Sequence, residues 1–495
     1  MKRNIVTFTL CVLAAAVASA QVRSSDAMDA MRKEFEAFRN KAHDDYEDFR
    51  KKANGEYADF LKKAWKEYMT IGAVPKPKEE PPVPPKPYED DKKPIKDTPK
   101  PIDEVIKPEP PSPRPEPVRP IEPTPAPVTD RWFAFRSFGT PMKVRLDDSH
   151  RFRLGAVSEN AVALAWQRLS DSAYDKLVAD CLALRRELQL SDWGYLLMLR
   201  DMSRAFLGDT NEATMLAAYV YCQSGYRMKF AHASGRLYML FASRHVLYDC
   251  GRFVVEGDYF YPFECKEKSL CISSAAFPGE QPLSLEIPSS PRLSMAATSP
   301  RTLKSRRYGD MAVTATVNKN VIDFYGSYPT SEIGGNFMTR WAMYANTPLG
   351  ESVSKTLYPA LRTKIAGCTQ PQAVNKLLNW VQTAFVYEYD TKVWGGDRAF
   401  FADETLYYPY CDCEDRSILF SRLVRDLLGL DVVLVYYPGH LATAVNLTEG
   451  DIKGDYLTLG GRRYVVCDPT YINAPAGHTM TGMDNSAAKV ILLNR

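Results

Sequence analysis

The sequence lacks most of the features that would assign it to a common functional class. It has only six histidines among 495 residues, and its net charge of +3 gives no reason to expect nucleic-acid binding. It contains no phosphate-binding GxxxxGK[ST] loop, no GxGxxG after a predicted strand and no HExxH helix. After the first 20 residues, no run reaches the roughly 18 apolar residues that a membrane-spanning helix needs.

The first 20 residues have the pattern of a secretory signal peptide. Residues 2–3 are basic, Ile5–Val17 is apolar, and residues 18–20 form a small-residue cleavage site. We therefore expect a mature protein that begins at Gln21 and is exported, in soluble form, to the periplasm or the extracellular space.

The cysteine count fits an exported protein with one free thiol. Ten cysteines are present, and Cys11 lies inside the signal peptide, with none closely following that would predict a lipid anchor. The remaining nine are an odd number, so at least one thiol stays unpaired or pairs with a partner. A catalytic cysteine accounts for this parity, and so does a buried free cysteine.

Residues 26–72 contain an 11-residue repeat that predicts an amphipathic helix of coiled-coil type. Aromatic residues recur at two positions of the unit: Phe35, Tyr46, Tyr57 and Tyr68, and Phe38, Phe49 and Phe60. Eleven residues over three turns is close to the helical period, so the aromatic face keeps its direction. A single helix cannot bury this face. It packs on the protein's own globular part, self-associates or docks to a partner, or lies on a membrane surface, which its mixed charges disfavour.

Residues 73–130 form a proline-rich linker. More than half of the 35 prolines of the chain fall there, among Lys, Glu and Asp residues. Such a composition favours extended polyproline II and cannot build a core, so we expect a spacer without chemistry of its own.

The composition becomes globular from residue 131, and the pattern predicts an α+β protein. We expect an α+β domain over 131–275, a β-rich connection over 276–335 and a domain that contains the catalytic residues over 336–495.

Cys413, His440 and Asp468 occur in that order near the end of the chain, each at the edge of a predicted element. Asp412 is a good helix N-cap, which places Cys413 in the first turn, where the helix dipole favours a thiolate. Glu414 and Asp415 oppose this effect. A thiol needs a base, and the base needs a third group to hold its tautomer.

The other two residues are predicted on neighbouring strands. Val432–Tyr436 is a strand of β-branched and aromatic residues, and a Pro-Gly turn follows it. His440 then leads a second strand, and Asp468 follows the strand Tyr464–Cys467. A helix that carries the thiol and packs on these strands can bring all three side chains into one cleft.

Three motifs resemble the transglutaminase-like superfamily: Tyr410–Ser417, the strand-leading His440, and Cys467-Asp468-Pro469-Thr470. The resemblance covers roughly residues 340–495. It implies a papain-like fold that cleaves or exchanges amides, with Cys413 as nucleophile, His440 as general base and then acid, and Asp468 as orienting carboxylate. No cofactor and no metal are expected.

Two features near Cys413 leave alternatives open. The oxyanion hole would use the Cys413 N–H and one side-chain donor from the preceding loop, where Trp394, Tyr408 and Tyr410 are candidates for that role or for the substrate groove. Cys411 stands where the superfamily often has glycine. It is either a reversible redox cap on Cys413 or a small buried residue.

These observations predict an exported cysteine acyl-transfer enzyme that acts on a peptide or protein substrate, with hydrolysis preferred over transfer to an amine. The alternative from a different class is a catalytically inactive envelope scaffold. A zinc site of Cys411, Cys413, His440 and Cys467 is disfavoured, because two ligands one residue apart at a helix start are awkward.

Residues 208–263 resemble the catalytic stretch in their order of elements. Thr210 is expected in the place of the thiol, a helix over 214–222 follows, and Arg236 falls near the place of the histidine. The segment is either a degenerate second copy that has lost its chemistry or a chance similarity between helix-then-strand segments.

Overall fold

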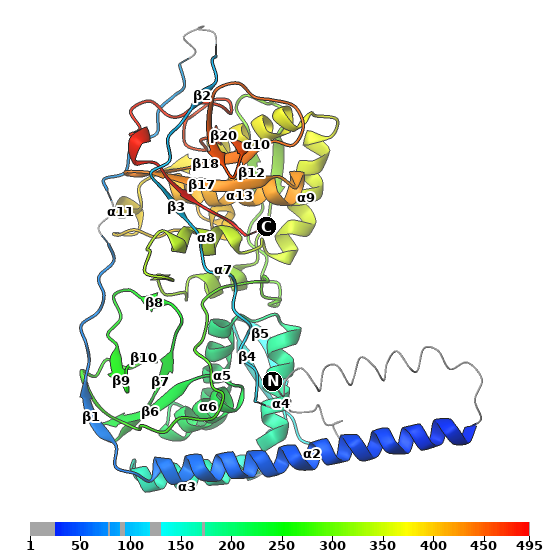
Figure 1. Cartoon of the computed structure of the whole chain (residues 1–495), viewed down its shortest axis with the longest axis vertical. Helices are drawn as coiled ribbons and strands as arrows, with labels where there is room; N and C mark the ends of the chain where they lie inside the picture. Colours follow the sequence, from blue (N-terminus) through cyan, green and yellow to red (C-terminus); the bar gives the residue numbers. More distant parts are fainter. Residues whose placement is uncertain (1–24, 78–79, 90–94, 119–129, 171–173, 495) are drawn as a thin grey trace. The chain divides into compact units, whose positions relative to one another are not determined.

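The computed structural model describes residues 25–77, 80–89, 95–118, 130–170 and 174–494. The predicted signal peptide lies outside these ranges, so export stays a prediction. The chain forms two compact units, Met1–Tyr57 and Ala58–Arg495, and each is described by itself. The second unit combines helices with several antiparallel sheets, which confirms the mixed α+β class (Figure 1). None of the helices within the described ranges is long and apolar enough to cross a bilayer.

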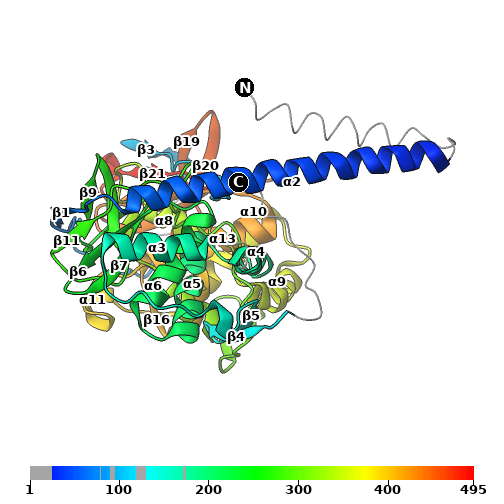
Figure 2. The ribbon, with the colours of Figure 1, turned by 90° about the horizontal axis from the view of Figure 1, so that it is seen from below.

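The N-terminal helix α2 spans Ser25–Leu61 and carries most of the 11-residue repeat (Figure 2). The prediction that this helix runs to residue 72 is wrong, because strand β1, Lys66–Met69, pairs antiparallel with β11, Ser269–Ile272. Tyr68, a repeat position, therefore lies opposite Leu270 in a sheet. The repeat cannot reveal this change, because the strand partner is distant in the sequence and tertiary pairing overrides local preference. What covers the aromatic face of α2 stays a prediction.

A six-stranded antiparallel sheet organises the first half of the second unit. Its strand order is β1-β11-β6-β7-β10-β9, and α6 packs on β6 and β7, with α5 beside α6 (Figure 2). The remaining strands are β6 Met228–Ala233, β7 Arg236–Ala242, β9 Phe253–Val255 and β10 Asp258–Pro262. The helices are α3 Glu159–Leu169, α4 Asp175–Glu187, α5 Asp192–Leu207 and α6 Asn211–Gln223.

A seven-stranded sheet organises the second half. Its order is β2-β19-β20-β18-β17-β21-β3, and α13 packs on β17 and β18 (Figure 1). The five inner strands are β17 Asp431–Tyr437, β18 His440–Asn446, β19 Asp455–Leu459, β20 Arg462–Cys467 and β21 Lys489–Ile491. The helices of this half are α8 Thr339–Asn346, α9 Glu351–Ile365, α10 Gln370–Ala384, α11 Asp390–Val393, α12 Ala402–Tyr407 and α13 Cys413–Leu428.

The connection over 276–335 is less β-rich than predicted. It contains the hairpin β12–β13, Arg301–Lys304 and Ala312–Ala315, and the short strand β14, Ser331–Glu332. Between them α7 forms at Lys319–Tyr325, because the Asn318 side chain accepts the N–H of residue 320 and caps a helix. Short elements complete the fold: β4 Phe133–Ser137, β5 Thr140–Val144, β8 Val246–Leu247, β15 Val386–Tyr387 and β16 Tyr410–Cys411.

The two large sheets share one strand order, which supports a duplication. The order β9-β10-β7-β6-β11 matches β19-β20-β18-β17-β21, all neighbouring pairs are antiparallel, and a helix, α6 or α13, precedes the first strand of each set. The predicted alignment is off by one residue. Thr210 caps α6 as Asp412 caps α13, so Asn211 rather than Thr210 stands in the place of Cys413.

Two further positions of the first copy can be matched. Arg236 opens β7, as His440 opens β18. The N–H of Leu237 donates to Asn211 Oδ1 at 2.9 Å, which ties the start of α6 to the start of β7. Residues 208–263 therefore have neither a thiol nor an imidazole at the positions that match Cys413 and His440.

The proline-rich segment packs along the second unit, which corrects the prediction of a free spacer. Its short strands β2, Thr98–Pro99, and β3, Glu104–Ile106, extend the seven-stranded sheet at opposite edges by parallel pairing. Further along, Glu116 pairs with the buried Arg185 at 2.5 Å. Composition indicates an extended backbone, but it cannot show which distant sheet edges offer unpaired backbone groups to it.

Residues 80–89 of this segment contact the half that contains Cys413. The N–H of Val83 donates to the Gly439 carbonyl at 2.8 Å, and the N–H of Tyr88 donates to the Ile472 carbonyl at 2.9 Å. The Tyr88 ring lies edge-on to Tyr471, with ring centroids 5.5 Å apart. We call residues 74–77 and 80–89 together the strap.

The docking of the strap can be tested with Tyr88→Ala. This change removes the contact with Tyr471 and the hydrogen bond between the Tyr88 hydroxyl and His478, 3.1 Å long. We expect a loss of about 1–2 kcal/mol in the free energy of unfolding and faster cleavage by Glu-C protease after Glu89. The control is Ile95→Ala, at an apolar residue that is 48% exposed in the same region. If both variants had the same free energy of unfolding and the same rate of cleavage, the segment would be a free spacer.

Candidate active site

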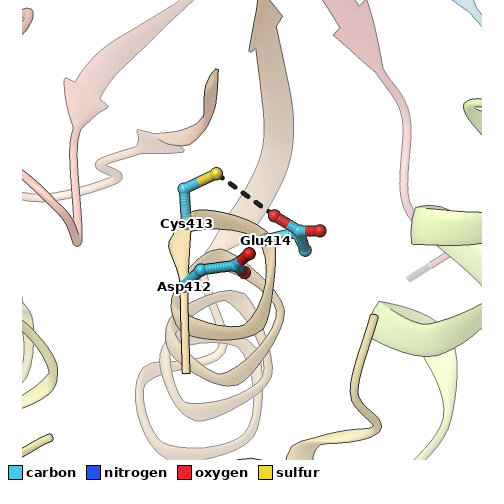
Figure 3. Close-up of side chains that lie close together, drawn as sticks. All are labelled: Asp412, Cys413 and Glu414. Carbon is cyan, nitrogen blue, oxygen red and sulfur yellow. Dashed lines mark hydrogen bonds between the residues drawn. The ribbon is translucent and has the colours of Figure 1, made fainter. Parts of the chain in front are cut away.

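Cys413 is the first residue of helix α13, as predicted from the cap sequence (Figure 3). Asp412 occupies the N-cap position, and its N–H donates to the Asp415 side chain at 3.2 Å. Gly429, in a left-handed conformation with φ of 66°, ends the helix. The thiol therefore projects from the first helical turn, at the positive end of the helix dipole.

The surroundings of the Cys413 thiol oppose the effect of this dipole. The side chain is 5% exposed, and its Sγ donates to Glu414 Oε2 at 3.1 Å (Figure 3). Burial raises the pKa of Cys413 well above its usual range, and the charges of Glu414 and Asp412 raise it further, while a hydrogen bond from the backbone of Leu441 lowers it. Without a base to take its proton, this group is a thiol rather than a thiolate.

His440 and Asp468 form a buried, hydrogen-bonded pair. His440 opens β18 after the turn at Gly439, and its Nε2–H donates to Asp468 Oδ2 at 2.9 Å. Asp468 follows β20, the neighbour of β18 in the sheet. Its other oxygen accepts the N–H groups of Thr470, at 2.8 Å, and Tyr471, at 3.1 Å, which fix the carboxylate. The acceptor-only carboxylate holds the imidazole with its proton on Nε2.

The other ring nitrogen of His440, Nδ1, is buried and has no hydrogen-bond partner. His440 and Cys413 both line a cavity of about 360 Å³, and Asp468 lies behind the imidazole. The remaining walls are mainly aromatic, acidic and strap residues: Trp341, Tyr389, Tyr436, Asp390, Asp397, Asp412, Glu414, Lys76, Pro77, Glu80, Pro81 and Pro82, with Thr391, Gly439 and Leu441. Cys413 and His440 thus line one cavity, and Asp468 joins them only through its bond to the imidazole. The Cys413 Sγ donates to Glu414, and no hydrogen bond joins it to His440 Nδ1.

The three predicted oxyanion or groove residues do not line this cavity. Trp394 packs edge-on to Tyr408, with ring centroids 4.9 Å apart, and the Arg398 guanidinium lies over both rings. Tyr410 lies in β16 and is 40% exposed.

Trp341, on helix α8, is the residue of the cavity that the sequence analysis missed. Trp341 lines the same cavity as Cys413, and its indole stacks on Tyr436, with ring centroids 5.5 Å apart. Its Nε1–H is buried and has no hydrogen-bond partner. An indole N–H is a donor only, so this group can bind an oxygen atom that enters the cavity. No local sequence signal points to it, because α8 reaches the cavity through the tertiary fold.

Cys411 points into the hydrophobic core. Its Sγ lies 3.9 Å from the Val386 carbonyl, and burial raises the pKa of its thiol to about 11. It does not line the cavity with Cys413, a placement that favours a packing role. Among the described residues, no metal-sized group of ligand atoms unites Cys411, Cys413, His440 and Cys467.

Acidic side chains surround the start of α13 instead. Three overlapping groups have side-chain donor atoms within 4.8 Å of one another: Asp412, Cys413 and Glu414; Asp390, Asp412 and Asp415; and Asp390, Asp397 and Glu414. Carboxylate oxygens of this kind can hold a cation. Burial, together with Glu414, raises the pKa of Asp390 to about 8. The Arg340 guanidinium pairs with Asp397 at 2.6 Å.

A larger cavity of about 890 Å³ lies elsewhere in the second unit and contains neither Cys413 nor His440. In it, Ser284 Oγ lies 3.4 Å from His245 Nε2. Burial lowers the pKa of His245 to about 3, so this imidazole is a poor base at neutral pH. We therefore assign the site to the smaller cavity.

The raised pKa of Asp390 predicts a pH-dependent stability. Because its folded-state pKa of about 8 exceeds its ordinary value of 3.8, the folded protein retains a proton that the unfolded chain releases. The stability that this carboxyl contributes is present in acid and is lost as the pH rises toward 8. In urea unfolding, Asp390→Asn should gain on the order of 1 kcal/mol or more relative to wild type between about pH 5 and pH 8. The exposed Asp148→Asn is the control, and an equal change in both variants would contradict the prediction.

Comparisons with protein-family models, with curated proteins and with solved structures find no significant match to this chain. The functional argument therefore depends on the geometry of the cavity and on the motifs in the sequence.

Proposed function

We propose that the protein is an exported cysteine acyl-transfer enzyme of the transglutaminase-like, papain-like type that hydrolyses amide bonds of peptides or proteins. One observation carries the proposal. Asp468 holds the His440 imidazole through Nε2, which leaves Nδ1 buried and unpartnered, and His440 lines the same cavity as Cys413. This is the arrangement that a thiol nucleophile requires of its base and of the group that orients the base.

Acylation would proceed as follows. His440 Nδ1 accepts the thiol proton as the Cys413 sulfur attacks the carbonyl carbon of the amide. The negative charge that develops on the carbonyl oxygen is stabilised by the Cys413 N–H and the Trp341 Nε1–H. The imidazolium, stabilised by Asp468, returns its proton to the amide nitrogen. The carbon–nitrogen bond then breaks, the amine leaves, and a thioester remains.

Deacylation uses the same groups with water in place of the amine. His440 takes a proton from water, the hydroxide attacks the thioester carbon, and the carbon–sulfur bond breaks as the sulfur regains a proton. An amine in place of water would form a new amide. We favour water, because no feature of the sequence marks a channel for an acceptor amine.

A second function, a catalytically inactive envelope scaffold, has one observation in its favour. The Cys413 side chain is 5% exposed, and burial and acidic neighbours raise the pKa of its thiol. A scaffold would need neither a reachable sulfur nor an unpartnered Nδ1, so a test of acylation separates the two functions.

Acylation can be measured without knowledge of the substrate. Wild-type protein treated with p-nitrophenyl acetate should release p-nitrophenolate and carry an acetyl thioester on Cys413, detected by mass spectrometry. Cys413→Ala should abolish both signals, and Asp468→Asn should slow acylation by about 10³–10⁴-fold, because the imidazole loses its orienting partner. The control Cys411→Ser should react like wild type. Acetylation that is independent of Cys413 would favour the scaffold.

The oxyanion assignment makes a separate prediction. Trp341→Phe keeps the ring but removes the N–H, and should slow the acetylation of Cys413 by roughly 10²–10³-fold with an unchanged far-UV spectrum. Trp394→Phe is the matched control, since Trp394 does not line the cavity, and should react at the wild-type rate. If Trp394→Phe slowed acetylation more than Trp341→Phe, the side-chain donor of the oxyanion hole would instead come from the loop before Cys413.

A further inference from the structure

The cavity beside Cys413 has a wall of carboxyl groups that the acylation mechanism does not use. Glu414 belongs to two of the acidic groups, one with Asp412 and Cys413 and one with Asp390 and Asp397, each within 4.8 Å. All five residues line the cavity. The wall therefore begins at the nucleophile and continues away from it through Asp390 and Asp397.

The carboxyl groups of this wall are incompletely satisfied by protein groups. Arg340 pairs with Asp397, and the backbone N–H of Arg398 donates to Asp390 Oδ2 at 2.6 Å. Asp412 is only 5% exposed, and one of its carboxylate oxygens, Oδ1, has no hydrogen-bond partner. A buried carboxylate oxygen without a donor is costly, and a cation that enters the cavity would relieve this cost.

The chain places one of its own cations at this wall. Lys76 lines the cavity, and its Nζ donates to the backbone carbonyl oxygen of Asp397 at 3.3 Å. Hydrogen bonds hold the strap before and after Lys76: Asp249 N–H donates to the Val74 carbonyl at 2.9 Å, and Val83 N–H donates to the Gly439 carbonyl at 2.8 Å. Gly439 permits this approach, because a Cβ there would lie 2.3 Å from the Pro81 carbonyl oxygen.

We propose that the wall of Asp390, Asp397, Asp412 and Glu414 is a substrate subsite for an ammonium or guanidinium group. The Lys76 ammonium, held at its edge by the Asp397 backbone carbonyl, competes for it in the free protein. The inference rests on the proposed function and specifies its substrate class as peptides with a lysine or arginine close to the amide that is cleaved. A basic substrate would displace Lys76 and bring its own cation beside Glu414. That charge would offset the effect of Glu414 on the thiol, because opposite charges a few ångströms apart attract strongly in a buried site.

The subsite can be tested on the full chain with n-butylammonium as the probe. The readout is the rate at which iodoacetamide alkylates Cys413, quantified by mass spectrometry of the peptide that contains Cys413. We expect this rate to change saturably with n-butylammonium but not with n-butanol. In Lys76→Met the half-saturating concentration should fall roughly fivefold or more, because the tethered competitor is gone. Asp390→Asn should weaken the response.

The control for the lysine change is Lys86→Met. Lys86 belongs to the same strap, but its Nζ donates to the Thr481 carbonyl at 2.6 Å and it does not line the cavity. This variant should respond like wild type. The proposal would be overturned if wild type, Lys76→Met and Lys86→Met had equal half-saturating concentrations of n-butylammonium. It would also be overturned if alkylation responded to calcium chloride but not to n-butylammonium.

A second measurement separates this inference from the proposed function. Peptide mixtures with Lys, Arg or Ala at each position are incubated with wild type and with Cys413→Ala. Cleavage that depends on Cys413 and favours Lys or Arg supports both proposals. Cleavage that depends on Cys413 without such a preference overturns the subsite alone. A saturable response to n-butylammonium without cleavage of any peptide overturns the proposed function alone.

Discussion

The account depends on one buried hydrogen bond, between His440 Nε2 and Asp468 Oδ2, 2.9 Å long. The sheet makes this bond possible, because β18 begins at His440 and Asp468 follows β20, the neighbouring strand. The turn after Asp468 fixes the carboxylate through two backbone N–H groups. The bond decides which ring nitrogen carries the proton, and so leaves Nδ1 as the unpartnered acceptor of a histidine that lines the cavity of Cys413.

The same cavity imposes an opposing constraint. Burial and the neighbouring carboxylates hold Cys413 in its protonated form, so the helix dipole alone cannot supply a thiolate. The imidazole must therefore take the proton as the bond to the substrate forms. In the proposed mechanism, a basic substrate lowers the electrostatic cost of removing the proton from the Cys413 thiol when it binds. The strap and its Lys76 would keep the acidic wall compensated until then.

The positions of Cys413, His440 and Asp468 at element edges follow from local signals: an Asp N-cap, a Pro-Gly turn and a strand that ends before proline. Local signals fail where the partner is distant in the sequence. Tyr68 fits a helical repeat but pairs with β11, and Trp341 reaches the cavity from a helix far upstream of the thiol. The packing of the proline-rich segment was missed for the same reason, since composition does not show which sheet edges are unpaired.

The most direct test of the central claim is crosslinking by 1,3-dibromoacetone, a short reagent that first alkylates a thiol and then a second nucleophile within a few ångströms. The account predicts one dominant crosslink, between Cys413 and His440, in the intact protein, and retention of that crosslink in Cys411→Ser. Alkylation of Cys413 without a crosslink to His440, or a crosslink from Cys413 to another residue, would contradict the account.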